Sequence, residues 1–474
     1  MLLSKTDFKK YLTCPFYLWL FKYRKDLLPE ELIHPSGKFI DEGKEVDELS
    51  KGLFPKGVEI GEFNLEGWKR TQASIKKGSK ILIQPTVVAG ELTSRADFLI
   101  YNEDFERWDI YEVKSSTAVK RGGQKTWNEN QIVDVAFQKI TWEKAGIKIG
   151  ATYIVYVNKD FVKHGEVKAE FCGPEKGEKG FFVKENVSGE VSEMMPFIEP
   201  EIESALSVIR IQKDVHEAMN ALCPDINSCN FISELSSDVR KMLGVELITE
   251  EGEEKKNLES VRLALKSLSY PLYFFDYETY DSAIPLFDGF HPYQKMPFQY
   301  SLHIKKSSSS KVEHKYFLAD KLENPMPDLL AQLNKDIGPR GSILVWYESF
   351  EKTRNEEMAK MYPEYADFLR GVNERVFDLM KVFDKELYWR KEFGTSRSLK
   401  VVAPVLAPDL PYSELNIHEG GTASASWKEL VDSNLPEHKK QELKTDMLKY
   451  CQRDTEVMVR ILDVVEREIK DGKN

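Results

Sequence analysis

The sequence predicts a mixed α/β protein with two domains. Apolar runs of the kind that form buried strands occur in both halves, for example at Ile81–Ile83 and Tyr270–Phe275, and helix-like segments lie between or after them. At 474 residues the chain is longer than a single domain usually is, and its 41% hydrophobic content is sufficient for real cores.

The composition excludes a membrane protein and a disordered chain. No apolar run approaches the roughly 20 residues that span a bilayer, and the first residues reach charge too early for a signal peptide. Five cysteines do not make a disulfide framework, so we expect a cytoplasmic protein. A net charge of -11 argues against a passive nucleic-acid coat. It is compatible with a nuclease, which needs clustered carboxylates and only a local basic track.

The first half mixes helices and strands. The expected helices are Lys5–Leu20, Gly37–Gly52 and Trp127–Ala145. The expected strands are Ile81–Ile83, Ala96–Tyr101, Trp108–Val113 and Ala151–Val157. Residues 102–104 give a turn signal, so the strands on either side of them are expected to form a hairpin.

In the second half the strands come first, and helices dominate from residue 348 onward. The expected strands are Tyr270–Phe275, Phe298–Ile304 and Ile343–Trp346, and the last helix is expected over Pro436–Lys470, with or without a break. A polar, charged stretch separates the halves. The predicted division is therefore a domain at 1–235, a linker at 236–265 and a domain at 266–474.

Three ionisable residues gather on the expected hairpin. Glu112 and Lys114 are two apart on one strand and so share a face, and Asp97 on the partner strand is placed to reach the same point. Two carboxylates suit Mg²⁺ or Mn²⁺, and a neighbouring lysine orients a water and stabilises the hydroxide that it becomes. The alternative is a surface salt bridge on a hairpin, because the pattern is short.

With the helix that follows, these residues resemble the PD-(D/E)XK nuclease core, which has a restriction-endonuclease-like fold. The branch they resemble is the RecB-like one, which includes the CRISPR-associated adaptation nucleases. The resemblance implies catalytic roles for Asp97, Glu112, Lys114 and Gln138, with Asp97 and Glu112 as metal ligands. Trp142 stands where the family has a tyrosine, and Gly43 with Asp47 stands where the family has Gly-x3-His, whose histidine is a further ligand.

The segment from Lys114 to residue 125 carries positive charge and no acid. Lys120, Arg121 and Lys125 make a local basic patch in an acidic protein, and such a patch suits phosphate contacts. We expect these residues to bind nucleic acid, with DNA as the expected partner and RNA as the alternative.

Three cysteines match positions that hold a [4Fe–4S] cluster in many RecB-like nucleases, namely Cys14, Cys223 and Cys229. The fourth cysteine, expected shortly after Cys229, is absent from the sequence. The alternatives are a labile cluster, a zinc site completed by another ligand, and a lost site with three ordinary cysteines. The lost or degenerate site is favoured.

Two more carboxylates, Asp276 and Glu278, share one face at the end of a buried strand in the second half. Burying both acids without a cation is costly. Far downstream, Tyr450 and Asp454 are four apart in a helix and share a face. For each motif taken alone, surface acids and a core tyrosine are the alternative interpretation.

Together these motifs resemble the DnaQ-like DEDD exonucleases, which have an RNase H-like fold. The resemblance implies that Asp276, Glu278, Glu351 and Asp454 hold two metal ions and that Tyr450 positions the water. Glu351 stands where the family has Asp, and Asp378 is a reserve ligand. The chain as a whole is similar to an uncharacterised bacterial family that fuses a RecB-like half to a DnaQ-like half.

We therefore expect a DNA-cleaving enzyme that uses Mg²⁺ or Mn²⁺ at two sites, the second trimming ends 3′→5′, in DNA processing, repair or phage- or CRISPR-related defence. Three alternatives stay open: one live site, a nucleic-acid-binding scaffold without activity, and an enzyme that acts on nucleotides. Lys114 and Tyr450 speak against the scaffold, because neither is needed for folding. The basic run favours polymers over nucleotides.

Overall fold

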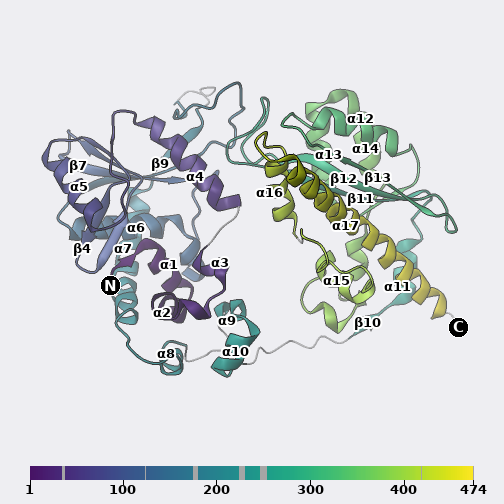
Figure 1. Cartoon of the computed structure of the whole chain (residues 1–474), viewed down its shortest axis with the longest axis horizontal. Coiled ribbons are helices and arrows are strands. Elements are labelled where there is room, and N and C mark those ends of the chain that lie inside the picture. Colours follow the sequence, from purple (N-terminus) through teal and green to yellow (C-terminus); the bar gives the residue numbers. More distant parts are fainter. Residues whose placement is uncertain are drawn as a thin grey trace. The chain divides into compact units, whose positions relative to one another are not determined.

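The computed structural model describes residues 1–34, 38–122, 124–173, 180–223, 230–245, 254–417 and 419–472. The chain is mixed α/β and divides into two compact units (Figure 1). The first unit comprises Met1–Ile248 and Ser282–Tyr293, and the second comprises Thr249–Asp281 and Gln294–Asn474. Within the described residues, no helix is both long and apolar enough to cross a membrane.

The main sheet of the first unit has the strand order β2-β3-β6-β7-β8-β9. Its strands are β2 (Val58–Glu59), β3 (Ile81–Ile83), β6 (Phe98–Asn102), β7 (Arg107–Lys114), β8 (Ile149–Val157) and β9 (Phe182–Asn186). β6 and β7 form the antiparallel hairpin that the turn signal predicts, and β8 runs parallel to β7. The hairpin puts the end of β7 beside the start of β6, which is where the predicted acids lie.

A small second sheet holds the N-terminus in place. β1 (Leu3–Ser4) pairs in parallel with β5 (Leu92–Arg95), which pairs with β4 (Thr86–Ala89). Directly after β1, Ser4 caps helix α1 (Lys5–Thr13) in a reciprocal capping box with Asp7. The start of α1 is thereby fixed next to the strand that leads to Asp97.

The helix expected over Lys5–Leu20 is two helices in the structure, α1 and α2 (Pro15–Tyr23). Cys14 between them is extended, with φ -164° and ψ 126°. Proline disfavours the helical conformation in the residue before it and suits the first turn of the next helix. Pro15 therefore explains the break that helical periodicity missed.

The other helices of the first unit pack around the sheets. They are α3 (Glu30–Ile33), α4 (Lys38–Ser50), α5 (Leu65–Lys76), α6 (Gln131–Lys144), α7 (Ser188–Val208), α8 (Val215–Leu222), α9 (Asn230–Glu234) and α10 (Ser237–Leu243). α6 begins at Gln131, four residues later than expected, because the Asn130 side chain caps it. α6 is buried along most of its length, which makes it the central helix of this unit.

The sheet of the second unit has the strand order β13-β12-β11-β14-β15. Its strands are β11 (Leu272–Tyr280), β12 (Met296–Lys305), β13 (Val312–Leu318), β14 (Ser342–Val345) and β15 (Val376–Asp378). The first three are antiparallel to one another, whereas β14 and β15 continue the sheet in parallel from β11. A separate short pair joins β10 (Lys255–Lys256) to β16 (Tyr388–Trp389).

Helices cover both faces of this sheet. The long helix α17 (Glu437–Asp471) runs along one face without a break (Figure 1), and the Gln299 amide donates to the Met447 carbonyl of that helix at 3.0 Å. On the other face, the Tyr300 hydroxyl donates to Asp336 of α12 (Met326–Asp336) at 2.7 Å. Alternate residues of β12 therefore point to opposite layers.

Further helices complete the second unit, namely α11 (Leu258–Leu265), α13 (Glu348–Met361), α14 (Ala366–Asn373), α15 (Leu399–Leu406) and α16 (Gly420–Leu430). Residues 236–265, suggested above as a linker, contain α10 and α11. The segment Ser282–Tyr293 lies between β11 and β12 in the sequence but belongs to the first unit. There Ala283 joins an apolar cluster, and the Tyr293 hydroxyl donates to the Ser115 carbonyl at 2.6 Å.

Candidate functional site

The first acidic cluster, called site 1, lies at the end of the β6–β7 hairpin. It comprises Lys5, Asp47, Asp97, Glu112, Lys114, Asp134 and Gln138. Asp97 directly precedes β6, and its carboxylate accepts the Val113 amide of β7 at 2.6 Å. The Lys114 ammonium donates to Glu112 Oε1 at 2.8 Å. The structure thus brings the three predicted hairpin residues together.

Helix α6 supplies two further side chains to site 1. The Gln138 amide donates to Glu112 Oε2 at 2.5 Å. One turn earlier, Asp134 accepts from Lys114 at 2.8 Å. Asp134 is not among the predicted residues, although its position four before Gln138 puts both on one helix face.

Trp142 does not reach site 1, contrary to the expectation that it replaces the family's tyrosine there. It is fully buried in an apolar cluster with Leu99 and Ile110, and its ring packs edge-on against Trp68 at 6.2 Å between centroids. An indole is too large and too apolar to leave that core for a polar cluster. Trp142 therefore serves the packing of α6 on the sheet.

Lysines keep the deepest acids of site 1 ionised. Burial alone would raise the pKa of Glu112, but the charges of Lys114 and Lys5 outweigh it and hold that pKa well below its usual range. Burial also opposes ionisation of Asp134, and the same two lysines lower its pKa. The pKa of Lys114 is raised in turn, because Asp134 and Glu112 outweigh the effect of its burial. The positive charges of Lys5 and Lys114 therefore nearly balance the negative charges of Glu112 and Asp134.

Two acids of site 1 are not neutralised in this way. Burial, and then the charge of Glu112, raises the pKa of Asp97 well above its usual range. The same two causes raise the pKa of Asp47 to about 6. Asp47 comes from α4, so the Gly43-x3-Asp47 spacing does deliver a carboxylate to the cluster. Asp47 and Asp97 are thus the acids of site 1 that its lysines compensate least, whereas both oxygens of Glu112 already accept hydrogen bonds.

The predicted nucleic-acid contacts have mixed positions. Lys120 is exposed. The Arg121 guanidinium is already held by Glu185 and by Glu190, the latter at 2.6 Å. A phosphate would compete with two carboxylates for that guanidinium, so the charge of Arg121 is less available than the sequence suggests. The side chain of Lys125 lies outside the described residues.

Two of the three candidate cluster cysteines lie side by side. The sulfur atoms of Cys14, between α1 and α2, and of Cys223, at the end of α8, are 3.7 Å apart. Cys229 lies outside the described residues. The pair thus brings the α1–α2 junction next to the end of α8.

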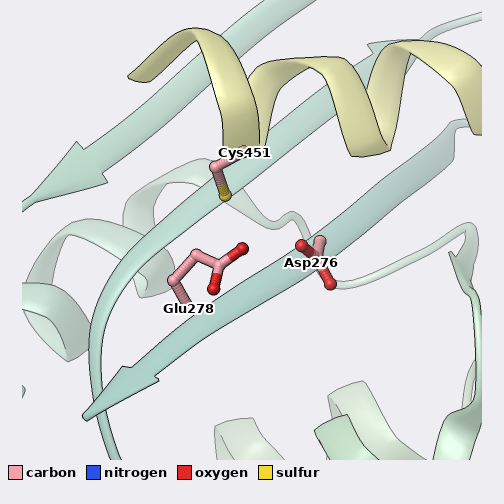
Figure 2. A group of neighbouring side chains, drawn as sticks. All are labelled: Asp276, Glu278 and Cys451. Atoms are coloured by element: carbon pink, nitrogen blue, oxygen red, sulfur yellow. The ribbon is translucent and has the colours of Figure 1, made fainter. Parts of the chain in front are cut away.

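The second acidic cluster, called site 2, lies between β11 and α17. It comprises Asp276, Glu278, Glu351, Lys400, Tyr412, Tyr450, Cys451 and Asp454. Figure 2 shows Asp276 and Glu278 on one strand, with the Cys451 sulfur directed at them from the helix above. One ligand atom from each of these three lies within 4.8 Å of the other two. The two-residue spacing on β11 aims both acids at α17.

Helix α17 also supplies the predicted Asp454 and Tyr450. Asp454 Oδ1 accepts from the Lys400 ammonium at 2.8 Å and from the Tyr412 hydroxyl. The same ammonium lies over two aromatic rings, 3.5 Å from the centroid of Tyr412 and 4.4 Å from that of Tyr450. Cation–π contact of this kind holds a lysine in place. The lysine thus occupies the open side of the acid cluster.

Glu351 completes the predicted acid set from the first turn of α13. It is 3% exposed, and its Oε2 atom is buried without a hydrogen-bond partner among the described residues. The turn into α13 is strained, because Tyr347 has φ +107°, a left-handed conformation that costs a bulky residue about 1–3 kcal/mol. The Asp378 carboxylate accepts the Tyr347 amide at 3.1 Å. Asp378 therefore supports this turn.

The acids of site 2 are pushed towards protonation. Burial, and then the charge of Asp454, raises the pKa of Asp276 well above its usual range. Burial and Asp276 do the same to the pKa of Glu278 and of Glu351. Burial and these carboxylates also raise the pKa of the Cys451 thiol. Several acids held close together and away from water are the arrangement that a divalent cation relieves.

Five residues of the two sites lay outside the sequence prediction: Lys5, Asp134, Lys400, Tyr412 and Cys451. The four-residue spacing to Gln138 was a usable signal for Asp134. Cys451 directly follows Tyr450 in the sequence, and this position next to a predicted site residue was a usable signal for it. Lys5 and Tyr412 have no such signal, because they lie 107 and 42 residues from the acids that they contact.

Fold and sites together define a mixed α/β protein with two clusters of buried acids. Within the described residues, the group with ligand atoms close enough together to hold a metal ion is Asp276, Glu278 and Cys451 of site 2. Residues 273–398 match the family described as "Domain of unknown function (DUF2779)". This range contains Asp276, Glu278 and Glu351 and ends before Tyr450 and Asp454.

The chain is also similar to two curated mycoplasma proteins. It is 24% identical over 214 residues to "Uncharacterized protein MG366" of Mycoplasma genitalium, which covers 42% of this chain and 32% of that protein. It is 26% identical over 206 residues to the homolog of that protein in Mycoplasma pneumoniae, which covers 40% of this chain and 31% of the homolog. The chain spans about a third of the length of these relatives.

Proposed function

We propose that the chain is a metal-dependent nuclease that cleaves phosphodiester bonds of DNA at site 2, and also at site 1. The convergence of Asp276, Glu278, Glu351 and Asp454 carries this proposal. Four carboxylates from β11, α13 and α17 lie near enough that charges within the group raise the pKa values of Asp276, Glu278 and Glu351. Among the described residues, the buried Oε2 atom of one of them, Glu351, has no hydrogen-bond partner. Such a donor set fits Mg²⁺ or Mn²⁺, which take oxygen ligands.

At site 2 these four acids would hold the cations, which when bound stabilise the attacking and leaving oxygens of a phosphodiester. The Tyr450 hydroxyl, on the same helix as Asp454, is suited to orient the attacking water. Its pKa is raised, by burial first and then by Asp454, so it stays protonated and acts as a hydrogen-bond donor. Lys400 is placed to contact the phosphate, because it already lies among the acids. This arrangement supports 3′→5′ trimming by a DnaQ-like exonuclease.

The fold proposed for the second unit is RNase H-like. The support is its strand order, with three antiparallel strands followed by two parallel ones and the acids on the central strand β11. For the first unit we propose a PD-(D/E)XK fold of the RecB-like branch. Its support is the β6–β7–β8 core with α6 donating Gln138 to Glu112.

At site 1, Asp97 and Glu112 would hold the cation, with Asp47 as a further ligand. Lys114 would orient the attacking water and stabilise the hydroxide that forms. DNA is the proposed substrate, with RNA as the alternative, in cytoplasmic DNA processing, repair or phage- or CRISPR-related defence.

A nucleic-acid-binding scaffold with an inactive first site is the second candidate. One observation favours it: Glu112 is engaged at both oxygens, by Lys5 and Lys114 on Oε1 and by Gln138 on Oε2. A cation at Glu112 must displace one of these donors.

The test is a cleavage assay with Mg²⁺ or Mn²⁺ on end-labelled single- and double-stranded DNA and RNA. Wild type is compared with Lys114→Ala and Asp276→Ala. We expect Asp276→Ala to lose stepwise end-trimming and Lys114→Ala to lose the remaining cuts. Activity that neither substitution alters, or a wild type inert with both metals, would overturn the nuclease and favour the scaffold.

A further inference from the structure

Lys5 enters site 1 from helix α1, 107 residues before the acid that it contacts, Glu112. The β1–β5 pairing fixes Ser4, and the capping box of Ser4 with Asp7 fixes the first turn of α1. Lys22 reinforces that turn by an ion pair with Asp7 at 2.8 Å. Lys5, the first residue of α1, is therefore held at the entrance of the cluster by backbone and side-chain contacts.

The Lys5 ammonium and the Lys114 ammonium contact the same oxygen, Oε1 of Glu112. Two like charges on one oxygen repel each other, and they stay together because carboxylates surround them. The Glu112 side chain is 3% exposed, whereas that of Lys5 is 23% exposed. The Lys114 side chain is 19% exposed, so both lysines are more accessible than the acid that they share.

A divalent cation that binds Glu112 would compete with both lysines for this oxygen. Lys114 has a second partner, Asp134 at 2.8 Å, which keeps it in place. The Lys5 ammonium donates to Glu112 alone among the hydrogen bonds of the described residues, and its four-carbon stem lets it swing without moving the helix. The cation would therefore displace Lys5.

We propose that Lys5 is a cation-displaced phosphate-binding residue of site 1: it holds Glu112 while the site lacks metal, and it contacts a phosphodiester of the nucleic acid once metal is bound. This inference rests on the proposed function of site 1. Once displaced, the Lys5 ammonium lies next to the bound cation. An incoming phosphate then neutralises the charge of this ammonium. Lys5 thus couples the binding of metal to the binding of nucleic acid.

The experiment compares Lys5→Met, Lys5→Arg and the matched control Lys10→Met, all in the Asp276→Ala background so that site 2 is disabled. Lys10 lies on the same helix, but its ammonium is 4.0 Å from the centroid of Phe21 rather than in the cluster. Two affinities are measured, that of Mn²⁺ by electron paramagnetic resonance and that of a short DNA oligonucleotide with Ca²⁺ by fluorescence anisotropy. Thermal unfolding checks that each variant folds.

We expect Lys5→Met to bind Mn²⁺ about tenfold more tightly, since a competing cation is gone, and to bind the oligonucleotide about tenfold more weakly. Lys5→Arg should keep most of the oligonucleotide affinity, and Lys10→Met should change neither affinity. A lysine with a purely structural role would weaken Mn²⁺ and oligonucleotide binding together, and that result would overturn the inference.

Unchanged Mn²⁺ affinity in a folded Lys5→Met protein would also overturn it. If Lys5→Met behaves as expected while the protein with an intact site 2 cleaves none of the substrates, the nuclease proposal fails and the inference about Lys5 stands. The two failures are therefore distinguishable.

Discussion

Site 1 and site 2 contain similar sets of buried acids but neutralise them differently. In site 1, Lys5 and Lys114 contact Glu112, and the pKa of that acid falls despite its burial. In site 2, Lys400 contacts Asp454, while Asp276 and Glu278 form no ion pair with a described residue. The pKa of each of these two acids rises, through burial and neighbouring acids.

This contrast teaches that burial alone does not decide whether a buried acid is charged. The position of the nearest cation decides it, because an opposite charge within a few ångströms outweighs the loss of hydration. Site 1 carries its own cations, which keep Glu112 and Asp134 ionised without metal, although the pKa values of Asp97 and Asp47 are raised. In site 2, Asp276 and Glu278 form no ion pair with a described residue. Metal binding should therefore change the stability of site 2 more than that of site 1.

Substituting Lys114 in site 1 and Lys400 in site 2 should give the largest difference in the free energy of unfolding. Lys114→Met leaves Glu112 and Asp134 buried with less compensation, and we expect it to lower the free energy of unfolding by about 3 kcal/mol. Lys400→Met should cost less than about 1 kcal/mol, since the Lys400 side chain is 36% exposed and Asp454 keeps its bond from Tyr412. Urea unfolding of both variants without metal measures these values. Equal losses of unfolding free energy in the two variants would contradict the proposed difference between the two sites.

The pH dependence of stability should differ in sign between Glu112 of site 1 and the acids Asp276 and Glu278 of site 2. The raised pKa values of Asp276 and Glu278 mean that, without metal, their contribution is most favourable below the ordinary carboxyl pKa of about 4 and is lost as pH rises. The lowered pKa of Glu112 works oppositely, so its contribution is present above about pH 4 and is lost on acidification.

Melting temperatures between pH 4 and pH 8, in EDTA and in Mg²⁺, test this sign. The stabilisation by Mg²⁺ should grow with pH by about 3 °C or more. An Asp276→Asn, Glu278→Gln double variant should lose most of this growth. In EDTA, Glu112→Gln should be less stable than wild type at pH 7, and the difference should shrink towards pH 4. If the stabilisation by Mg²⁺ did not change with pH, the proposal that the acids of site 2 bind a cation would be contradicted.

The smallest effect should come from the thiol at site 2. Mg²⁺ prefers oxygen, so Cys451→Ser should change Mg²⁺-dependent end-trimming by less than about threefold. Cd²⁺ favours sulfur, and its affinity should fall about tenfold in the same variant. Isothermal titration with both metals separates the two effects. A similar loss for both metals would indicate that Cys451 acts through packing rather than through its sulfur.

Much of each site was visible in the sequence, because its residues are related by local periodicity. The two-residue spacing of Glu112 and Lys114 puts both at one end of β7, and the four-residue spacing of Tyr450 and Asp454 puts both on one face of α17. Strand and helix periods are properties of the backbone and need no knowledge of the fold. Pro15, which divides α1 from α2, was also readable, but the apolar run across it hid the break.

The sequence by itself determined the α/β class, both acid motifs and the helix faces that carry them. Only the tertiary structure decided which cations meet those acids: Lys5 reaches Glu112 and Lys400 reaches Asp454 across 107 and 54 residues of chain. It also decided that Trp142 packs in the core and that Ser282–Tyr293 belongs to the first unit. The reason is that periodicity specifies which way a side chain points from its own element, whereas its partner depends on how distant elements pack.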